Sequence, residues 1–320
     1  MIVNMSKSKV MVFRQGGRLA ANETWLFKEN PIEIVNEYTY LGVILTPRLS
    51  FQKHLEERSK KAKASINVTW KHFLSKPDIP FSFKRELFYA VCRAILCYVA
   101  QIWGFKAFEV AEKLQRFFIK KCLMLPDNTP NYALLLETLI PDNFLYCLEQ
   151  NLNYLIKTVN KMSENRLPHQ FTRKLVSQNI SCFKELNILG HPFGINFSLD
   201  NIHVWESYKE LLIFNLTKIS YEKAEQSALQ SSDRFYKHLD YSKGPSYLID
   251  GNNKFKLMWI FKAQTDTFFL NANQYGVEDA RKRCFLCDLR EPEDIAHFIG
   301  RCLMLEEYRQ IFYGKSTLSR

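Results

Sequence analysis

Three of the eight cysteines lie close to a histidine in the last part of the chain. Cys284, Cys287, His297 and Cys302 form the pattern Cys-x2-Cys-x9-His-x4-Cys. Two thiolates from one short turn can bind a single ion, and a more distant histidine and cysteine can complete a tetrahedral Zn²⁺ site. Four protein ligands leave no open position, so this zinc would be structural. The alternative is a chance cysteine pair beside a core histidine.

The helix that carries the histidine must be interrupted if His297 and Cys302 are to bind the same ion. Residues five apart on a continuous α-helix point about 140° away from each other. Gly300 lies between the two residues and is expected to break the helix. Cys302 would then begin a second helix through "LMLEEYRQIF", where the helix dipole favours a thiolate.

Motifs for other chemistry are absent from the sequence. It contains no Gly-x-Ser-x-Gly elbow, no glycine loop for phosphates and no His-Glu-x2-His helix. It also contains no tight aspartate pair of the kind that holds two Mg²⁺ ions. Glu293 and Asp294 are adjacent, but they lie inside the cysteine cluster and are expected to be exposed charges at a helix start.

The net charge of +11 over 320 residues favours an anionic partner. Nucleic acid is the usual one, with an acidic membrane surface or mere basicity as alternatives. The most apolar segment, Leu87 to Trp103, is interrupted by Arg93 and Gln101, so it fits a buried helix better than a membrane span.

The expected location is intracellular, in the cytoplasm, the nucleus or both. The N-terminal segment "MIVNMSKSKVMVF" has no long apolar run of the secretory kind. Five further cysteines stand singly among apolar residues, as small core residues do in a reducing compartment. They are Cys92, Cys97, Cys122, Cys147 and Cys182.

The elements that must position these residues are predicted to be strands followed by many helices. Residues 8–46 are rich in β-branched and aromatic residues and predict strands, with a turn at Asn30–Pro31. From Ser50 a helical period begins, and a second helix is expected up to about Trp103. A third helix spans roughly Phe108 to Leu125.

Further helices are predicted at 131–180, broken at Pro141 and Pro168, and at 203–240. The segment 242–254, "SKGPSYLIDGNNK", is the best linker candidate. The fold class is therefore mainly α, with a small N-terminal β-ribbon and a C-terminal zinc knuckle.

Basic side chains gather on two of the predicted helices. Lysines and arginines crowd one end of the first helix, and Lys113, Arg116 and Lys120 share a face of the third. Such faces bind phosphates without reading sequence. The alternative is a merely solvated face, since Glu56 and Glu57 are interleaved with the lysines of the first helix.

Several stretches together resemble the C-terminal part of the reverse transcriptase of non-LTR (LINE-type) retrotransposons, in particular the jockey-like and I-element-like group. The stretches that carry the resemblance are "VNMSKSKVMVF", "VNEYTYLGVILTPRLSFQKHL", "LCYVAQIWG", "LQRFFIKKCLMLPDNTPNYALLLETL" and "CFLCDLREPEDIAHFIGRC". The region of about 165–280 matches least specifically. The gap of nine residues between Cys287 and His297 is longer than the commoner family gaps.

The resemblance implies four consecutive parts. They are the end of a polymerase palm with the primer-grip strand (1–48), a helical thumb (49–128), a helical connector (129–250) and a segment with the zinc knuckle (251–320). It places Tyr40, Leu41 and Gly42 at the primer grip. The phosphate contacts to template and primer, RNA or DNA, would be Lys60, Lys63, Lys71, Arg116 and Lys120. The ligands of structural Zn²⁺ would be Cys284, Cys287, His297 and Cys302.

The catalytic aspartates of the family, which include an Ala-Asp-Asp hairpin, have no counterpart in the sequence. We therefore expect a truncated product that has no polymerase activity alone and needs Mg²⁺ only within an intact parent enzyme. A second hypothesis is a working polymerase whose palm and fingers come from an upstream exon. A third is a zinc-held helical scaffold that binds another protein and has no polymerase role.

Overall fold

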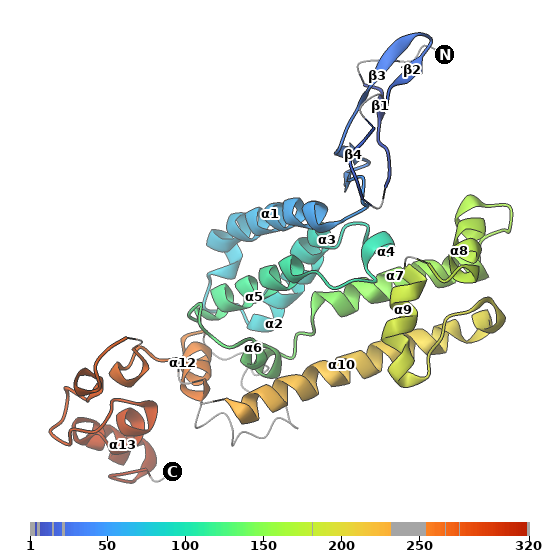
Figure 1. The fold of residues 1–320 in the computed structure, drawn as a ribbon. Coiled ribbons are helices and arrows are strands. Elements are labelled where there is room, and N and C mark those ends of the chain that lie inside the picture. The colour runs from blue at the N-terminus through green and yellow to red at the C-terminus, as the bar shows by residue number, and fades with distance from the viewer. Residues whose placement is uncertain are drawn as a thin grey trace. The chain divides into compact units, whose positions relative to one another are not determined.

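The described part of the chain is mainly helical, with a small β region before the first helix (Figure 1). This confirms the mainly helical class and the small N-terminal β region, while the palm, thumb and zinc-knuckle assignments stay predictions. The computed structural model describes residue 4 and residues 7–14, 16–20, 23–180, 182–231, 254–265, 267–274 and 276–318. The expected linker at 242–254 falls outside these residues except for its last one, and so does the expected boundary at residue 250.

The chain forms two compact units, each assembled from three segments. The first unit comprises Met1–Thr69, Leu87–Gln115 and Asp142–Thr217, and the second comprises Trp70–Glu86, Arg116–Pro141 and Lys218–Arg320. Helices α5 (Glu109–Leu123) and α10 (Trp205–Gln230) each continue from one unit into the other. The units therefore interleave along the sequence, whereas the four parts implied by the resemblance are consecutive.

Short strands precede the first helix, as the sequence predicts. They are β1 (Lys9–Val10), β2 (Trp25–Phe27), β3 (Asn30–Ile34), β4 (Tyr38–Tyr40) and β5 (Val43–Leu45). Strand β3 pairs with β1 in parallel and with β2 in antiparallel orientation. Strands β4 and β5 form a separate hairpin in which Tyr40 lies opposite Val43.

The turn between β2 and β3 lies two residues before its expected place. Lys28 and Glu29 form it, with φ values of 48° and 68°. A two-residue hairpin turn of this type needs positive φ at both positions. The expected turn at Asn30–Pro31 is wrong, because these residues already belong to β3 and pair with β2.

Helix α1 (Gln52–Thr69) has the predicted buried face, which includes Leu55, Ala62 and Ile66. The long helix expected up to Trp103 is wrong as a continuous element. It is divided into α2 (Phe81–Leu87), a π-helical turn (Phe88–Arg93), α3 (Ala94–Leu96) and α4 (Ala100–Trp103). Val99 has a φ of 60° between α3 and α4, and this left-handed conformation ends the helix there.

The predicted helices after residue 130 are present. They are α6 (Asn131–Thr138), α7 (Asn143–Asn160) and α8 (Leu167–Ser177). Pro141 lies between α6 and α7, and Pro168 lies in the first turn of α8. A proline is accepted in a first helical turn because its missing N–H would have no partner there.

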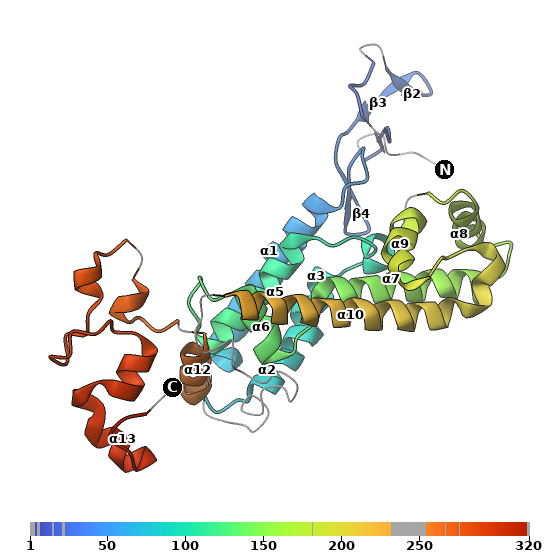
Figure 2. The ribbon, with the colours of Figure 1, turned by 60° about the horizontal axis from the view of Figure 1, so that its bottom comes forward.

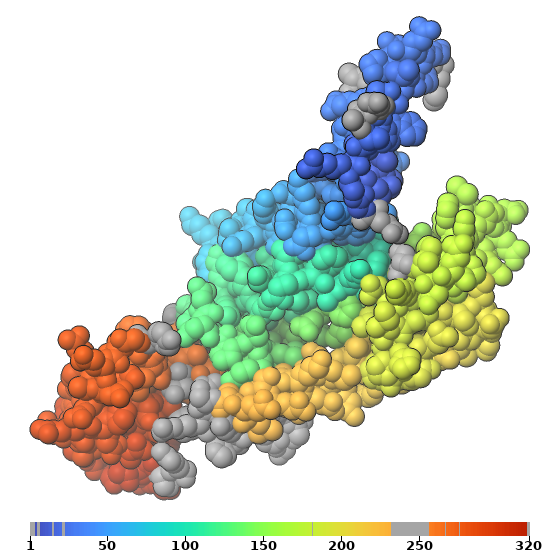
Figure 3. Space-filling model, in the orientation of Figure 1, coloured from blue at the N-terminus to red at the C-terminus, as the bar shows by residue number. Residues whose placement is uncertain are grey.

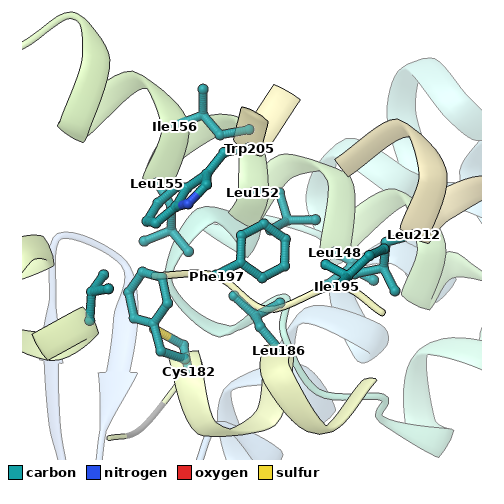
Figure 4. Packing of buried hydrophobic residues seen from close by; sticks show 12 residues of the cluster. Leu148, Leu152, Leu155, Ile156, Cys182, Leu186, Ile195, Phe197, Trp205 and Leu212 are labelled. Carbon is teal, nitrogen blue, oxygen red and sulfur yellow. The ribbon is translucent and has the colours of Figure 1, made fainter. Parts of the chain in front are cut away.

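The core of the first unit lies between α7, α9 (Cys182–Gly190) and the first half of α10. Trp205 packs edge-on against Phe197, with ring centroids 5.5 Å apart, and its indole N–H donates to the carbonyl of Ser198 at 3.1 Å. The first part of α10 lies beside α7, where Lys209 donates to Asn153 (Figure 2). The side chains of this core include Leu148, Leu152, Leu155, Ile156, Leu186 and Leu212 (Figure 4).

The second unit contains a π-helical turn (Trp70–Leu74), most of α2, α6, α12 (Lys254–Gln264) and α13 (Glu306–Tyr313). Among its buried residues are Leu74, Phe81, Phe118, Leu134 and Phe261. In its last part, single helical turns and loops replace long helices.

Candidate metal centre and nucleic-acid interface

A short antiparallel contact closes the loop that carries the first two cysteines. Arg283 and Pro292 form an isolated bridge. The amide of Cys284 donates to the carbonyl of Glu291 at 2.9 Å. Cys284 and Cys287 therefore lie on a loop whose two ends are held together, and their sulfur atoms can bind the same ion.

The four predicted ligands come together. The Sγ atoms of the three cysteines and a ring nitrogen of His297 all lie within 4.8 Å of one another. The Sγ atoms of Cys284 and Cys302 are 4.0 Å apart, and Cys287 Sγ is 3.3 Å from His297 Nε2. Ligands about 2.3 Å from one tetrahedral ion are about 3.7 Å apart, so these spacings suit a metal.

A π-helical turn, Ala296–Arg301, aligns His297 with Cys302. The amide of Cys302 donates to the carbonyl of His297 at 2.7 Å, five residues earlier. Such a turn is wider than an α-helical turn and brings residue i+5 above residue i. The divergence expected on an α-helix is thereby removed without a break at Gly300, which lies inside the turn, so the expected break is wrong.

The expected helix start at Cys302 is confirmed in part. Cys302 has extended backbone angles, φ −58° and ψ 121°, and precedes a single 3-10 turn, Leu303–Leu305. Helix α13 begins only at Glu306. The thiol therefore lies before a short turn and not at the first residue of a long helix.

Three charged side chains that the spacing did not identify surround the histidine. Glu291 accepts hydrogen bonds from His297 Nδ1 at 3.1 Å and from Arg301 Nε at 2.9 Å. Both hydrogen bonds hold the pKa of Glu291 below its usual value, and the bond from Arg301 has the larger effect. A carboxylate on Nδ1 fixes the tautomer that leaves Nε2 free for a metal. Asp294 accepts the backbone N–H of His297 at 2.7 Å.

Glu293 and Asp294 differ from their expected role as exposed charges. Both are half-buried, and Glu293 accepts the backbone N–H of Asn271 at 3.1 Å. They hold the backbone of the tail and do not form a catalytic pair. Glu291 lies between Cys287 and His297 in the sequence, so its position is a local sign of proximity to the ligands. Its contact with His297 depends on the folded loop.

The thiols differ in their ionisation. Burial raises the pKa of Cys284 to about 11. For Cys287, burial opposes the charged form, but backbone N–H groups of Leu289 and Leu303 outweigh it and lower the pKa. Three thiols and one imidazole are a common donor set for structural Zn²⁺. The cluster can hold a metal ion and is compatible with structural zinc.

The five predicted phosphate contacts are divided between the two units. Lys60 and Lys63 are exposed on α1, which lies at the surface in Figure 3. Lys71, Arg116 and Lys120 belong to the second unit. The structure therefore groups only the α1 pair with the primer-grip residues, which belong to the same unit.

Existing interactions engage some of these cations. Lys60 pairs with Glu57 at 2.6 Å. Lys120 is half-buried and donates to the carbonyl of Asp127 at 2.5 Å, and burial lowers its pKa. An exposed pair such as Lys60–Glu57 is weak and can be exchanged for a phosphate. Lys120 would first have to give up a partner at the end of α5.

Tyr40, Leu41 and Gly42 form the tip of the β4–β5 hairpin. The turn residues Leu41 and Gly42 have φ values of 47° and 79°. A Cβ at Gly42 would lie 3.0 Å from a guanidinium nitrogen of Arg58. The guanidinium of Arg58 therefore packs closely against this glycine, and the missing side chain is needed for a contact within the protein itself.

Among the described residues, no helix is long and apolar enough to cross a membrane. No protein-family model, curated protein or solved structure matches the chain.

Proposed function

We propose that this chain binds nucleic acid through the basic faces of its first 128 residues, while structural Zn²⁺ holds its C-terminal tail in shape. The ligand that the quoted motifs favour is the template–primer duplex of a reverse transcriptase, RNA paired with DNA. Synthesis of DNA is not proposed for these residues, because it requires paired carboxylates for Mg²⁺.

The distribution of charge carries this proposal. Residues 1–128 contain 21 lysines and arginines against 11 aspartates and glutamates, whereas residues 129–320 contain 23 against 22. Almost all of the net charge of +11 therefore resides in the segment with the hairpin and α1. A polyanion that releases counterions on contact is the partner such a segment attracts most strongly.

The test is fluorescence anisotropy of a labelled RNA–DNA hybrid at several salt concentrations. We expect affinity to fall steeply with salt. The double variant Lys60→Gln/Lys63→Gln should reduce the slope of log K against log salt by about 0.9 for each phosphate that it no longer neutralises. The matched control is Lys218→Gln/Lys223→Gln, which removes the same charge from exposed positions of α10.

Two results would overturn the proposal. One is no salt-dependent binding by the wild type at a concentration where another basic protein binds. The other is an equal decrease of affinity in the α1 and α10 variants, since this would show a response to net charge without an interface on α1.

A second candidate function, a zinc-held scaffold for a protein partner, has an observation of its own. The tail exposes many large apolar side chains, and Phe285, between the two first cysteines, is 76% exposed. Tyr308, Ile311 and Phe312 repeat at helical spacing on α13 and are all exposed. From Phe285 onward, the exposed large apolar residues are Phe285, Leu286, Leu289, Ile299, Leu303, Met304, Tyr308, Ile311, Phe312 and Tyr313.

Large exposed apolar surfaces usually mark contacts with other proteins. Light scattering tests this candidate directly. If the tail docks onto protein, wild type should self-associate or bind a partner, and Ile311→Asp/Phe312→Asp should abolish this without changing the affinity for the hybrid. A wild type that stays monodisperse and monomeric, and captures no partner that the variant fails to capture, would remove it.

A further inference from the structure

The turn between β4 and β5 holds a strained residue. Leu41 and Gly42 both have positive φ, and glycine or asparagine is the usual choice at such positions. A leucine with a φ of 47° persists only where the surrounding structure holds it. The surroundings of this turn therefore show how the conformation is maintained.

Two side chains hold the two carbonyl groups of the turn. The hydroxyl of Tyr98 donates to the carbonyl of Leu41 at 2.9 Å, and a guanidinium nitrogen of Arg58 donates to the carbonyl of Gly42 at 2.6 Å. The guanidinium also lies 4.1 Å from the centre of the Tyr98 ring. Arg58 and Tyr98 therefore support each other as well as the turn.

The position of Tyr98 is itself determined by its neighbours. Val99 has a φ of 60°, which is rare for a β-branched residue. The indole N–H of the buried Trp103 donates to the carbonyl of Tyr98 at 3.0 Å. A second strained residue and a buried anchor thus turn Tyr98 towards the hairpin.

This arrangement presents two apolar side chains to solvent. Tyr40 is 59% exposed and Leu41 is 75% exposed. Arg58 belongs to the same helix as Lys60 and Lys63, so the tip and the lysines are connected through α1. An exposed aromatic ring beside cations is the usual combination for stacking on a base while the cations bind the backbone.

We propose that Arg58 and Tyr98 are positioning residues that hold the Leu41–Gly42 turn, so that Tyr40 and Leu41 contact an unpaired base of the bound nucleic acid. The proposal rests on the proposed function, since it assigns a base contact to the same nucleic-acid interface. Phosphate attraction belongs to the lysines, whereas the tip contributes the contact with a base.

The experiment uses an RNA–DNA hybrid with a short single-stranded overhang that carries 2-aminopurine, whose fluorescence is quenched by stacking. At saturating protein, wild type should quench the probe. Tyr40→Ala should abolish the quenching and lower affinity by about tenfold. Tyr98→Phe, which removes one hydroxyl, should reduce the quenching at saturation and leave the salt slope unchanged.

Arg58→Lys keeps the charge but cannot both cover the Tyr98 ring and reach Gly42, so quenching should fall there too. Leu41→Asn suits the positive φ and removes the apolar contact, which keeps the test valid if another variant fails to fold. Tyr208→Phe, elsewhere in the first unit, is the control and should quench like wild type.

The outcomes separate this inference from the proposed function. If wild type does not bind the hybrid, the proposed function is wrong. If wild type binds but never quenches the probe, or if Tyr98→Phe and Arg58→Lys quench as wild type does, the positioning role is wrong and phosphate binding stands. A decrease of quenching in Tyr208→Phe equal to that in Tyr98→Phe also overturns the positioning role.

Discussion

The carbonyl of His297 accepts the amide hydrogen of Cys302 at 2.7 Å, across the end of a π-helical turn that connects two candidate ligands. An α-helical turn over the same residues would point the imidazole and the thiol apart. The wider turn places both in the group with Cys284 and Cys287. A backbone irregularity thus completes the candidate metal centre.

Removal of one ligand should remove the metal. We expect wild-type protein to contain zinc and Cys302→Ser to lose it, because serine does not supply a thiolate to the fourth position. Elemental analysis of purified protein measures this. Cys182→Ser, at a buried cysteine of the first unit, is the control and should keep its zinc. Equal zinc in the two variants would contradict the ligand assignment.

Glu291 should strengthen the site without touching the metal. Its carboxylate orients His297 through Nδ1 and is held by Arg301. Glu291→Gln should weaken zinc binding by about tenfold or more, as is typical for such partners. Competition with a chromophoric chelator measures the affinity. Glu307→Gln, on the exposed start of α13, should bind zinc as wild type does; an equal weakening there would point to a general charge effect.

The sequence predicts the ligands because their spacing is local and their chemistry is restricted to few residue types. It does not predict the π-helical turn, because the choice between a break at Gly300 and a wider turn depends on packing around the segment. The carbonyl of Gly300 accepts the amide of Leu318 at 3.0 Å, and a Cβ there would lie 3.1 Å from the Leu318 carbonyl. Contacts with residues so much later in the chain leave no local pattern.

The fold shows the same division. Periodicity predicts α1 and its buried face, since Leu55, Ala62 and Ile66 repeat at helical spacing. It does not predict the interruption at Val99, because a left-handed conformation is rare for a β-branched residue and the residue type gives no sign of it. Tyr98 and Leu41 are 57 residues apart in sequence, so their hydrogen bond could not be read from either segment.

His54 should make stability depend on pH. It is buried, its Nδ1 accepts the amide of Ile44 at 3.3 Å, and burial, with the nearby charges of Arg58 and Lys61, lowers its pKa from 6.5. As pH falls below about 6.5, the unfolded chain binds a proton that the folded chain refuses, so the free energy of unfolding decreases until the lower folded pKa is passed.

Urea unfolding at about pH 7.5 and about pH 5.5 measures this dependence. His54→Asn keeps an acceptor oxygen and does not titrate, so its stability should change less between the two conditions than that of wild type. His191→Asn, at an exposed histidine, should follow wild type. An unchanged pH dependence in His54→Asn would show that other groups cause the acid sensitivity.

Glu112 should be a major stabiliser of the first unit. The side chain is buried, and its two oxygens accept the amides of Asn143 at 3.0 Å and Phe144 at 2.9 Å, at the start of α7. Glu112→Gln replaces one acceptor by an NH₂ group that faces an N–H, so one buried donor is left without its partner, at a cost of about 1–3 kcal/mol. The variant also lacks the charge that complements the helix N-terminus.

Urea unfolding followed by tryptophan fluorescence should report the destabilisation of Glu112→Gln, because Trp103 and Trp205 are buried in the same unit. Glu164→Gln, at an exposed position between α7 and α8, should be neutral; equal stability of both variants would mean that α7 does not depend on this carboxylate.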